Sequence, residues 1–501
     1  MSPEVTHFRD LLGEVFDLQA AAAVLSWDQN TYMPPGGAEA RAFQLSTLSR
    51  LAHERFTGEA FGEALEAAEQ ATAGSPPESD EFCLAKRTRR EYDKRRRVPA
   101  EWVAEHARLT ALAHQAWQDA RKRSDFASFK PHLARIVALK QEYAGFFAPY
   151  DHMYDPLLDD YEPGMKTVEV ETVFRSLRPV QVELVRAIAE SGRQVDDSVL
   201  HQEYAEEKQL QFGAEVIKDF GFDFERGRQD KSPHPFTTGF GIGDVRITTR
   251  FQLRFFNDCF FSTLHEAGHA MYAQGVSPTL DRTPLIDGAS LGIHESQSRM
   301  WENIVGRSLP FWRHYYGRLQ AIFPAQLGNV PLEQFHRAVN KVHPTLIRTE
   351  ADETTYNLHV MLRFELELAL ILGELAVDDL PGIWNEKMRE YLGITPPDDA
   401  QGVLQDIHWS GGMIGYFSTY ALGNLIACQL WEKIRQDIPG VEAQIERGSF
   451  AALLGWLRET IHRHGAKFEP MVLLKRAVGS GLDAAPYIRY LHDKYGAIYA
   501  L

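Results

Sequence analysis

The segment Phe261-Ser-Thr-Leu-His265-Glu266-Ala-Gly-His269-Ala-Met-Tyr272 carries the strongest signal in the chain. In an α-helix, positions i and i+4 project from one face, so His265 and His269 can bind one metal ion from the same side. Glu266 follows the first histidine directly and can reach a water molecule on that ion. The spacing is typical of zinc hydrolases and predicts a helix over this segment.

A catalytic zinc site usually takes three protein ligands and leaves one position open, so a third ligand must come from another segment. Glu295, in Gly292-Ile-His-Glu-Ser-Gln-Ser-Arg299, is the nearest strong candidate because a helical pattern follows it. It would complete a set of two histidines and one glutamate, with Glu302 as the fallback ligand. The alternative is that a glutamate near the start of a helix caps it or interacts with its dipole.

Glu266 points about 100° around the helix from His265, which keeps it from binding the same ion. Its position favours the role of a general base, which takes a proton from the attacking water and passes it to the leaving amine. This chemistry hydrolyses peptide or amide bonds. The alternative is a packing helix without a metal, but burying ionisable side chains beside Phe260, Phe261 and Leu264 is costly unless they are paired.

Apolar residues recur at helical spacing through most of the chain, which predicts a mostly α-helical protein. Phe364, Leu368 and Ile371 form one such stripe, and Arg363 and Glu367 fall on the other side of that predicted helix. A length of 501 residues allows two or three domains or one large helical body. The breaks between helices are short, and none is long enough to be a disordered linker between domains.

One segment departs from the helical pattern. Gly239-Phe-Gly-Ile-Gly-Asp-Val-Arg-Ile-Thr-Thr-Arg250 passes from glycines to an alternation with β-branched residues, which predicts a short strand or hairpin. It lies directly before the helix with His265. The edge of such a strand could pair with the backbone of an extended peptide, or the hairpin could be purely structural.

Composition and charge disfavour several classes of function. The chain has three cysteines without a CxxC pair and a net charge of −16, which argue against a disulfide framework and against nucleic-acid or anionic membrane partners. The first residues lack a basic patch followed by an apolar core, so they do not resemble a secretory signal. The uncharged stretch from Trp409 to Trp431 contains too many small polar residues for a membrane span. We therefore expect a cytoplasmic protein.

A basic stretch is the one feature that suggests nucleic-acid binding. Glu91 and Asp93 interrupt it and Tyr92 is its only aromatic residue, so a solvated helix face or a partner for acidic side chains fits better. Its cations are Lys86, Arg87, Arg89, Arg90, Lys94, Arg95, Arg96 and Arg97.

With these residues in view, the chain resembles the carboxypeptidase Taq family of zinc metallocarboxypeptidases nearly end to end. The amino-terminal Trp27-Asp-Gln-Asn-Thr31 followed by Met33-Pro34 is similar to that family. Five further motifs carry the resemblance: His234-Pro-Phe236, Asp244-Val-Arg-Ile-Thr248, His294-Glu-Ser-Gln297, Ile347-Arg-Thr-Glu-Ala-Asp352 and Gly402-Val-Leu-Gln-Asp-Ile-His-Trp409.

The resemblance implies a single catalytic domain over residues 1–501. This domain would be a two-lobed helical body with a deep central groove, similar to neurolysin and angiotensin-converting enzyme, in a cytoplasmic homodimer. It leaves open a role for the amino-terminal helices as a lid. It also implies removal of single residues from peptide carboxyl termini with broad preference. By position, His265, His269 and Glu295 match the zinc ligands of the family, and Glu266 matches its general base.

An exopeptidase must recognise a free carboxylate, and a guanidinium does so with two parallel hydrogen bonds. We favour Arg348 for this role, with Arg246 and His234 shaping the closed end of the groove. The alternative for Arg348 and Arg246 is pairing with internal carboxylates such as Asp352 or Asp244.

A tyrosine hydroxyl or a histidine commonly helps the metal to stabilise the oxyanion of the tetrahedral intermediate. Tyr420 is our first choice and His408 the second, while Tyr416 is also suitably placed to contact substrate. For each of the three, the alternative is a buried aromatic side chain with only a structural hydrogen bond.

Two rival functions remain. An oligopeptidase or dipeptidyl carboxypeptidase would share every metal ligand and differ in the distance from the carboxylate-binding group to the metal. A helical interaction module with a vestigial metal site is the rival from another class. We expect one zinc ion per chain, with cobalt or manganese as substitutes, because ligand identity alone does not fix the metal.

Overall fold

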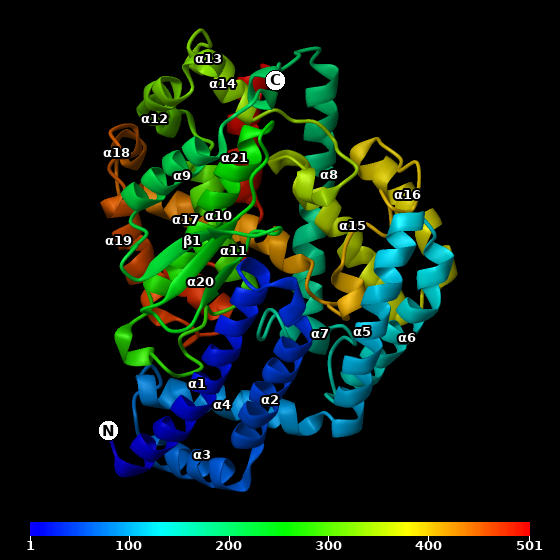
Figure 1. Ribbon diagram of the computed structural model, residues 1–501, viewed down its shortest axis with the longest axis vertical. Helices are drawn as coiled ribbons and strands as arrows, with labels where there is room; N and C mark the ends of the chain where they lie inside the picture. The colour runs from blue at the N-terminus through cyan, green and yellow to red at the C-terminus, as the bar shows by residue number, and fades with distance from the viewer.

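The computed structural model describes residues 1–501, and Figure 1 shows them as helices gathered around one small sheet. Helices make up 69% of the chain. The predicted fold class, mostly α-helical with one small sheet near the site, is therefore confirmed.

The amino-terminal helices form a unit with its own apolar core. Phe8, Leu12, Phe56 and Leu65 belong to this core, which also takes in Leu280 from a later loop. In Figure 1 the unit lies at the lower end of the molecule. Its helices are α1 (Pro3–Thr31), α2 (Ala38–Thr57), α3 (Glu59–Thr72) and α4 (Asp80–Arg97).

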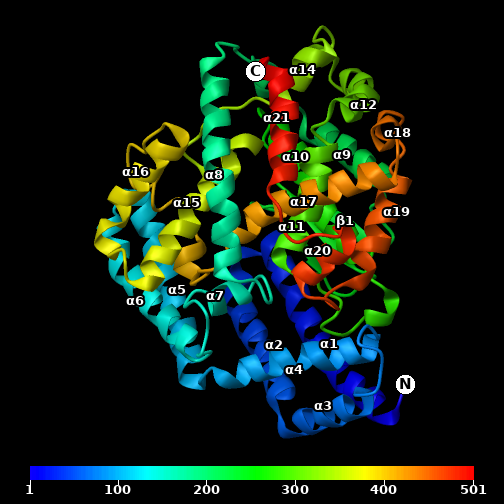
Figure 2. The same cartoon turned by 180° about the vertical axis from the view of Figure 1, so that it is seen from behind.

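The remaining helices form two groups on either side of the molecule, with a few long helices between them (Figures 1 and 2). One group contains α5 (Ala100–Arg123), α6 (Phe126–Gly145), α7 (Asp155–Asp159), α15 (Glu353–Leu372) and α16 (Leu380–Leu392). The other contains α9 (Glu206–Phe220), α10 (Phe256–Gln274), α11 (Leu291–Arg299), α12 (Leu309–Ile322), α13 (Pro324–Leu327), α14 (Leu332–Val339), α18 (Val441–Glu446), α19 (Ala451–Thr460) and α20 (Pro470–Val478). Between them lie α8 (Thr167–Glu190), α17 (Ser418–Asp437) and α21 (Ala485–Tyr499).

The sheet has three strands, β1 (Gly227–Lys231), β2 (Thr237–Gly239) and β3 (Val245–Thr249), in the order β1-β3-β2. β2 and β3 form the antiparallel hairpin that the sequence predicts, and β1 pairs with β3 in parallel. β1 was not predicted, because Gly227-Arg-Gln-Asp-Lys231 contains no apolar or β-branched residue. One edge of β2 remains unpaired within the sheet.

α15 begins where its capping residue predicts, but two of its charged side chains are buried and not exposed as expected. Asp352 caps its first turn by accepting hydrogen bonds from the backbone N–H groups of Thr354 and Thr355. Arg363 and Glu367, expected on the outer side, are both fully buried. Packing on both sides of α15 encloses these charges, and buried partners compensate them.

The uncharged stretch from Trp409 to Trp431 lies mostly in the protein interior. Most of its residues in α17 are buried, and α17 contacts both α11 and α15. No helix of the protein combines the length and apolarity needed to cross a bilayer.

Candidate metal centre

The helix α10 presents two histidines from one face. His265 and His269 lie one turn apart with ring centroids separated by 5.0 Å, as the sequence spacing predicts. The rest of the helix is anchored by buried apolar residues such as Phe260 and Leu264. Because α10 packs between β3 and α11, the two imidazoles are held on a rigid element.

Glu295 on α11 completes a cluster of three ligand atoms. Its Oε2 lies 3.5 Å from Nε2 of His265 and 3.5 Å from Nε2 of His269. The three atoms all lie within 4.8 Å of one another. Ligands about 2.0–2.1 Å from a tetrahedral ion stand about 3.3–3.4 Å apart, so this spacing fits a zinc-sized divalent ion.

The outer nitrogens of both histidines have partners, which leaves each Nε2 free for a metal. Nδ1 of His265 lies 2.9 Å from Oε2 of Glu302, and Nδ1 of His269 lies 3.3 Å from Nδ1 of His294. Such partners fix the orientation of a ligating imidazole. Glu302, the fallback ligand, thus contacts the far side of His265 and is outside the ligand cluster.

Arg299 holds both glutamates in position. Its Nε donates to Oε1 of Glu295 at 2.7 Å, and its Nη1 donates to Oε2 of Glu302 at 3.1 Å. Glu302 lies in the π-helical segment η4 (Met300–Val305), directly after α11. Burial alone would raise the pKa of Glu302, but the Arg299 charge and the His265 hydrogen bond lower it to about 2. The carboxylate is therefore charged.

Two helical glycines allow the helices of the centre to approach closely. A Cβ atom on Gly268 of α10 would lie 2.6 Å from Cα of Ser298 on α11. A Cβ atom on Gly423 of α17 would lie less than 3.0 Å from the side chain of Glu295. Since glycine inside a helix costs about 1 kcal/mol relative to alanine, close packing is the physical reason for it here.

Glu266 lies beside the cluster and outside it. Its side chain is buried, and its Oε2 accepts a hydrogen bond of 2.5 Å from Oγ1 of Thr237 on β2. It does not belong to the group of potential metal ligands. This placement agrees with the predicted separation between ligands and base.

A second polar group lies where α17 begins. Tyr420 stands one turn before Gly423, so it occupies the face of α17 that meets Glu295. Its hydroxyl lies 3.2 Å from Nε2 of His408 in η7 (His408–Gly411), and its ring lies 5.2 Å from that of Tyr416. Burial, assisted by the Arg348 charge, lowers the pKa of His408 to about 3, so its imidazole is neutral.

Arg348, in η5 (Arg348–Glu350), lies against this group. Its Cζ is 4.9 Å from the centroid of the Tyr420 ring. Nε and Nη2 donate to Oδ1 of Asp406 at 3.0 and 2.9 Å, and Nη1 donates to the Tyr356 hydroxyl at 2.9 Å. The sequence had suggested Asp352 as a possible internal partner of Arg348, and the structure shows Asp406 instead.

Tyr356 connects Arg348 to the metal centre. Its ring lies beneath the guanidinium of Arg299, with 4.6 Å from Cζ to the ring centroid. Because Arg299 binds the candidate ligand Glu295, the cluster of candidate ligands and the Arg348 group are parts of one connected site.

Arg246 and His234 form no hydrogen bond or ion pair with the candidate ligands or with Arg348. Arg246 forms two hydrogen bonds with Asp244, at 2.9 and 2.7 Å, and its guanidinium stacks on Trp27 of α1. It pairs with Thr238 across the sheet, whereas the neighbouring Thr237 is the residue that contacts Glu266. Because side chains alternate along a strand, Arg246 occupies the face opposite to α10. The His234 side chain is exposed in the loop before β2.

Comparison with known proteins identifies the family of this chain. The family model described as Carboxypeptidase Taq (M32) metallopeptidase matches residues 7–495. The chain belongs to the carboxypeptidase Taq (M32) family. Curated relatives of this M32 chain include Thermostable carboxypeptidase 1 of Thermus thermophilus, 45% identical with 100% of both chains covered, and Carboxypeptidase 1 of Bacillus subtilis, 38% identical with 99% and 98% covered.

Solved structures agree with this assignment. The M32 carboxypeptidase from Deinococcus radiodurans R1 has a TM-score of 0.97 and 42% identity over 100% of both chains. The Pyrococcus furiosus carboxypeptidase has a TM-score of 0.95 and 37% identity over 99% of both chains. The protein is thus a metallocarboxypeptidase, a peptide hydrolase that requires a divalent metal, and the family resemblance found in the sequence is confirmed.

Arg299, Thr237 and Asp406 were not predicted to belong to this M32 centre. Arg299 and Asp406 fall inside or beside quoted motifs, so their spacing to Glu295 and His408 was a usable signal. Thr237 follows His234-Pro-Phe236 directly, but nothing in the sequence indicates its contact with Glu266.

We expect the variant Gly423→Ala to damage the metal centre of this M32 enzyme. The added methyl group must displace the Glu295 side chain or separate α17 from α11, at a cost of about 1–3 kcal/mol in unfolding free energy. Metal affinity should fall together with stability, as measured by denaturant unfolding and by competition with a chelator. Gly455→Ala on α19, where an added Cβ meets no atom within 4 Å, is the matched control. Unchanged metal affinity in Gly423→Ala would contradict this packing argument.

We expect Asp406→Asn to be strongly destabilising. Asp406 neutralises two buried guanidinium groups, since Oδ2 also accepts a hydrogen bond of 2.6 Å from Arg363. Removing one partner of a buried ion pair costs about 3–5 kcal/mol. Asp378→Asn, which removes an exposed pair with Lys130, should change the unfolding free energy by less than about 1 kcal/mol. A loss below 1 kcal/mol in Asp406→Asn would contradict the argument.

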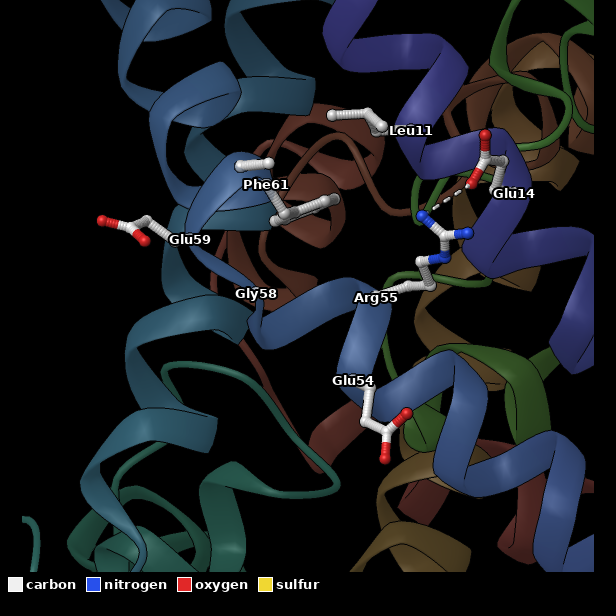
Figure 3. A pocket seen from close by; sticks show the side chains of 8 residues that line it. Leu11, Glu14, Glu54, Arg55, Gly58, Glu59 and Phe61 are labelled. Carbon is white, nitrogen blue, oxygen red and sulfur yellow. Dashed lines mark ion pairs between the residues drawn. The ribbon is translucent and has the colours of Figure 1, made fainter.

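The pocket drawn in Figure 3 lies away from the metal centre, in the amino-terminal unit. Side chains of α1, α2 and α3 line it, including Leu11, Arg55 and Phe61. Arg55 faces Glu14 at 3.7 Å across it. None of the predicted site residues belongs to this pocket.

The basic stretch on α4 meets acidic side chains within the protein. Arg90 and Lys94 pair with Asp159, Lys94 also pairs with Asp160, and Arg90 lies 3.6 Å from Glu469. These ion pairs join the amino-terminal unit to the rest of the molecule. For Arg90 and Lys94 the surroundings are therefore acidic side chains of the protein and not a solvated helix face.

Proposed function

We propose that this protein is a zinc carboxypeptidase that releases single amino acids from peptide carboxyl termini with broad preference. The observation that carries the proposal is the convergence of His265, His269 and Glu295, with the Glu266 carboxylate held beside them. Membership of a family of metallocarboxypeptidases supports the choice of substrate.

Zinc fits the donor set best. Two imidazole nitrogens and one carboxylate oxygen form the ligand class of catalytic zinc sites, and the close spacing of the three atoms suits a tetrahedral ion. Cobalt and manganese can occupy the same donor set, so we propose them as substitutes.

When bound, the zinc ion would acidify a water molecule and polarise the scissile carbonyl group. Glu266 takes the proton of the attacking water on its carboxylate and transfers it to the amine of the leaving amino acid. Burial of Glu266 limits its contact with bulk water, so the proton remains available for the leaving group. In this scheme the carboxylate acts first as base and then as acid.

Tyr420 and His408 act on the oxyanion of the tetrahedral intermediate. The Tyr420 hydroxyl is the first donor, because its face of α17 meets Glu295. Nε2 of His408 contacts the Tyr420 hydroxyl and orients it. A neutral imidazole has one N–H group, so Nε2 can donate to the Tyr420 oxygen and leave the hydroxyl proton for the oxyanion. The Tyr416 ring packs against the Tyr420 ring and can contact the substrate beside it.

Arg348 binds the carboxylate of the substrate terminus. A guanidinium carries five N–H groups, and three of them are donated to Asp406 and Tyr356, which leaves one each on Nη1 and Nη2. These two can form a paired hydrogen bond with a carboxylate. Arg246 and His234 shape the closed end of the groove through the sheet and the loop before β2.

Product analysis tests the function directly. We expect a tripeptide blocked at its amino terminus to yield a free single amino acid. Release of an intact dipeptide would favour the dipeptidyl carboxypeptidase, and the absence of any metal-dependent product would favour a vestigial site. Zinc content per chain, measured on protein purified without chelator, shows whether an inactive sample has simply lost its metal. Only an inactive protein with bound zinc would then count as evidence against the proposed reaction.

We propose that the protein is a cytoplasmic homodimer. Its partners are peptide substrates, and it binds neither nucleic acid nor a membrane. The three cysteines are free and buried, which agrees with a reducing compartment. We also propose that residues 1–501 are a single catalytic domain with α1–α4 as a lid. The separate apolar core of α1–α4 supports a distinct unit, and the ion pairs of α4 with Asp159 and Asp160 hold this unit against the body.

A further inference from the structure

Thr237 is the only hydrogen-bond partner of the Glu266 side chain. Its Oγ1 lies 2.5 Å from Oε2 of Glu266 and 3.0 Å from the Glu266 backbone carbonyl oxygen. Glu295, by comparison, has Ser298 and Arg299 as partners of its two oxygens. The orientation of Glu266 therefore depends on one hydroxyl group.

The pairing of the strands places the Thr237 side chain on the face of the sheet that contacts α10. Thr237 pairs with Ile247 of β3, and Ile247 pairs with Gln229 of β1, so all three project from the same face. Gln229 also reaches α10, where its Nε2 donates to Oγ1 of Thr263 at 2.9 Å. The strands are thus rigid supports for polar groups that contact the helix of the metal centre.

A carboxylate without a fixed partner turns easily about its terminal torsion, which has a broad energy profile. A hydrogen bond to Oε2 fixes the plane of the carboxylate and leaves Oε1 as the oxygen free to face the substrate. The second contact, to the backbone of the same residue, ties this orientation to α10 itself.

We propose that Thr237 is a positioning residue for the reaction, which orients the Glu266 carboxylate for proton transfer. The proposal rests on the proposed role of Glu266 as general base. The reacting groups of an enzyme must be held in near-attack geometry, and a shift of 1 Å costs about 100-fold in rate. Loss of the Thr237 hydroxyl should therefore reduce turnover more than it reduces substrate binding.

The test compares Thr237→Val, which keeps the shape and removes the donor, with Thr237→Ser, which keeps the donor. We expect Thr237→Val to lower kcat about 10- to 100-fold with KM changed less than 3-fold, and Thr237→Ser to restore most of the turnover. Thr238→Val is the matched control on the same strand, because its side chain projects from the opposite face and forms no hydrogen bond. Metal content and Tm should match the wild type in all three variants.

A double variant separates this proposal from the proposed function. If Glu266 is the base and Thr237 acts through it, adding Thr237→Val to Glu266→Gln should lower the residual kcat by less than 2-fold. A Thr237→Val enzyme with kcat within 2-fold of the wild type, or a full additional loss in the double variant, would overturn the positioning role. High turnover in Glu266→Gln alone would instead overturn the proposed base.

Discussion

Replacing Glu266 by glutamine should lower kcat about 10²- to 10⁴-fold while the metal stays bound. Glutamine has nearly the same shape but cannot take a proton, and general acid–base catalysis contributes about 10²- to 10⁴-fold to kcat. Glu266 is not among the three ligand residues, so the metal site should remain complete. The measurements are kcat on a blocked peptide and metal content per chain after dialysis.

Asp258→Asn is the matched control for this experiment. Asp258 lies on the same helix but forms a partly exposed ion pair with Arg250, which is worth little. We expect its activity to remain close to that of the wild type. If Glu266→Gln lost its metal together with its activity, Glu266 would have to be part of the ligand set, against the geometry of α10.

Replacing Glu295 by glutamine should have the opposite result, because the metal itself is lost. The substitution removes the only anionic group of the three and weakens the hydrogen bond from Arg299, because the amide oxygen that accepts it is no longer charged. We expect metal affinity to fall by more than 100-fold, beyond the 10- to 100-fold effect that changes in the partners of ligands typically cause. Competition with a metal-binding dye measures the affinity.

Glu302→Gln gives the comparison that separates a ligand from its partner. Glu302 contacts Nδ1 of His265 and not the metal side of the ring, so we expect a loss of about 10- to 100-fold in affinity. An equal or larger loss in Glu302→Gln than in Glu295→Gln would show that the two glutamates exchange roles when the metal binds.

The sequence was sufficient to predict the parts of the site that depend on local spacing. His265 and His269 share a face because a helix repeats every 3.6 residues. Glu295, predicted as the third donor because a catalytic metal site usually takes three protein ligands, lies within reach of both histidines. The hairpin of β2 and β3 was predictable for the same reason, because alternation of β-branched residues is a local pattern.

Features that depend on three-dimensional packing were not predictable. Arg363 and Glu367 were expected on the outer side of their helix, yet helices on both sides bury them beside partners from distant segments. Asp406 joins Arg348 and Arg363 across 58 and 43 positions of sequence, and no periodic pattern encodes such a contact.

Close contacts between elements were also hidden. Gly423 looks like an unremarkable residue in an apolar stretch, and only the structure shows that Glu295 fills the space beside it. Thr237 gains its role from the register of a three-stranded sheet whose first strand has no sequence signal.

X-ray diffraction at the zinc absorption edge, from crystals of the zinc-loaded protein, tests the central claim most directly. The account predicts a single strong anomalous peak within bonding distance of Nε2 of His265, Nε2 of His269 and the carboxylate of Glu295, with Glu266 unbound beside it. A peak at another place, or no peak in protein that is saturated with zinc and active, would contradict it.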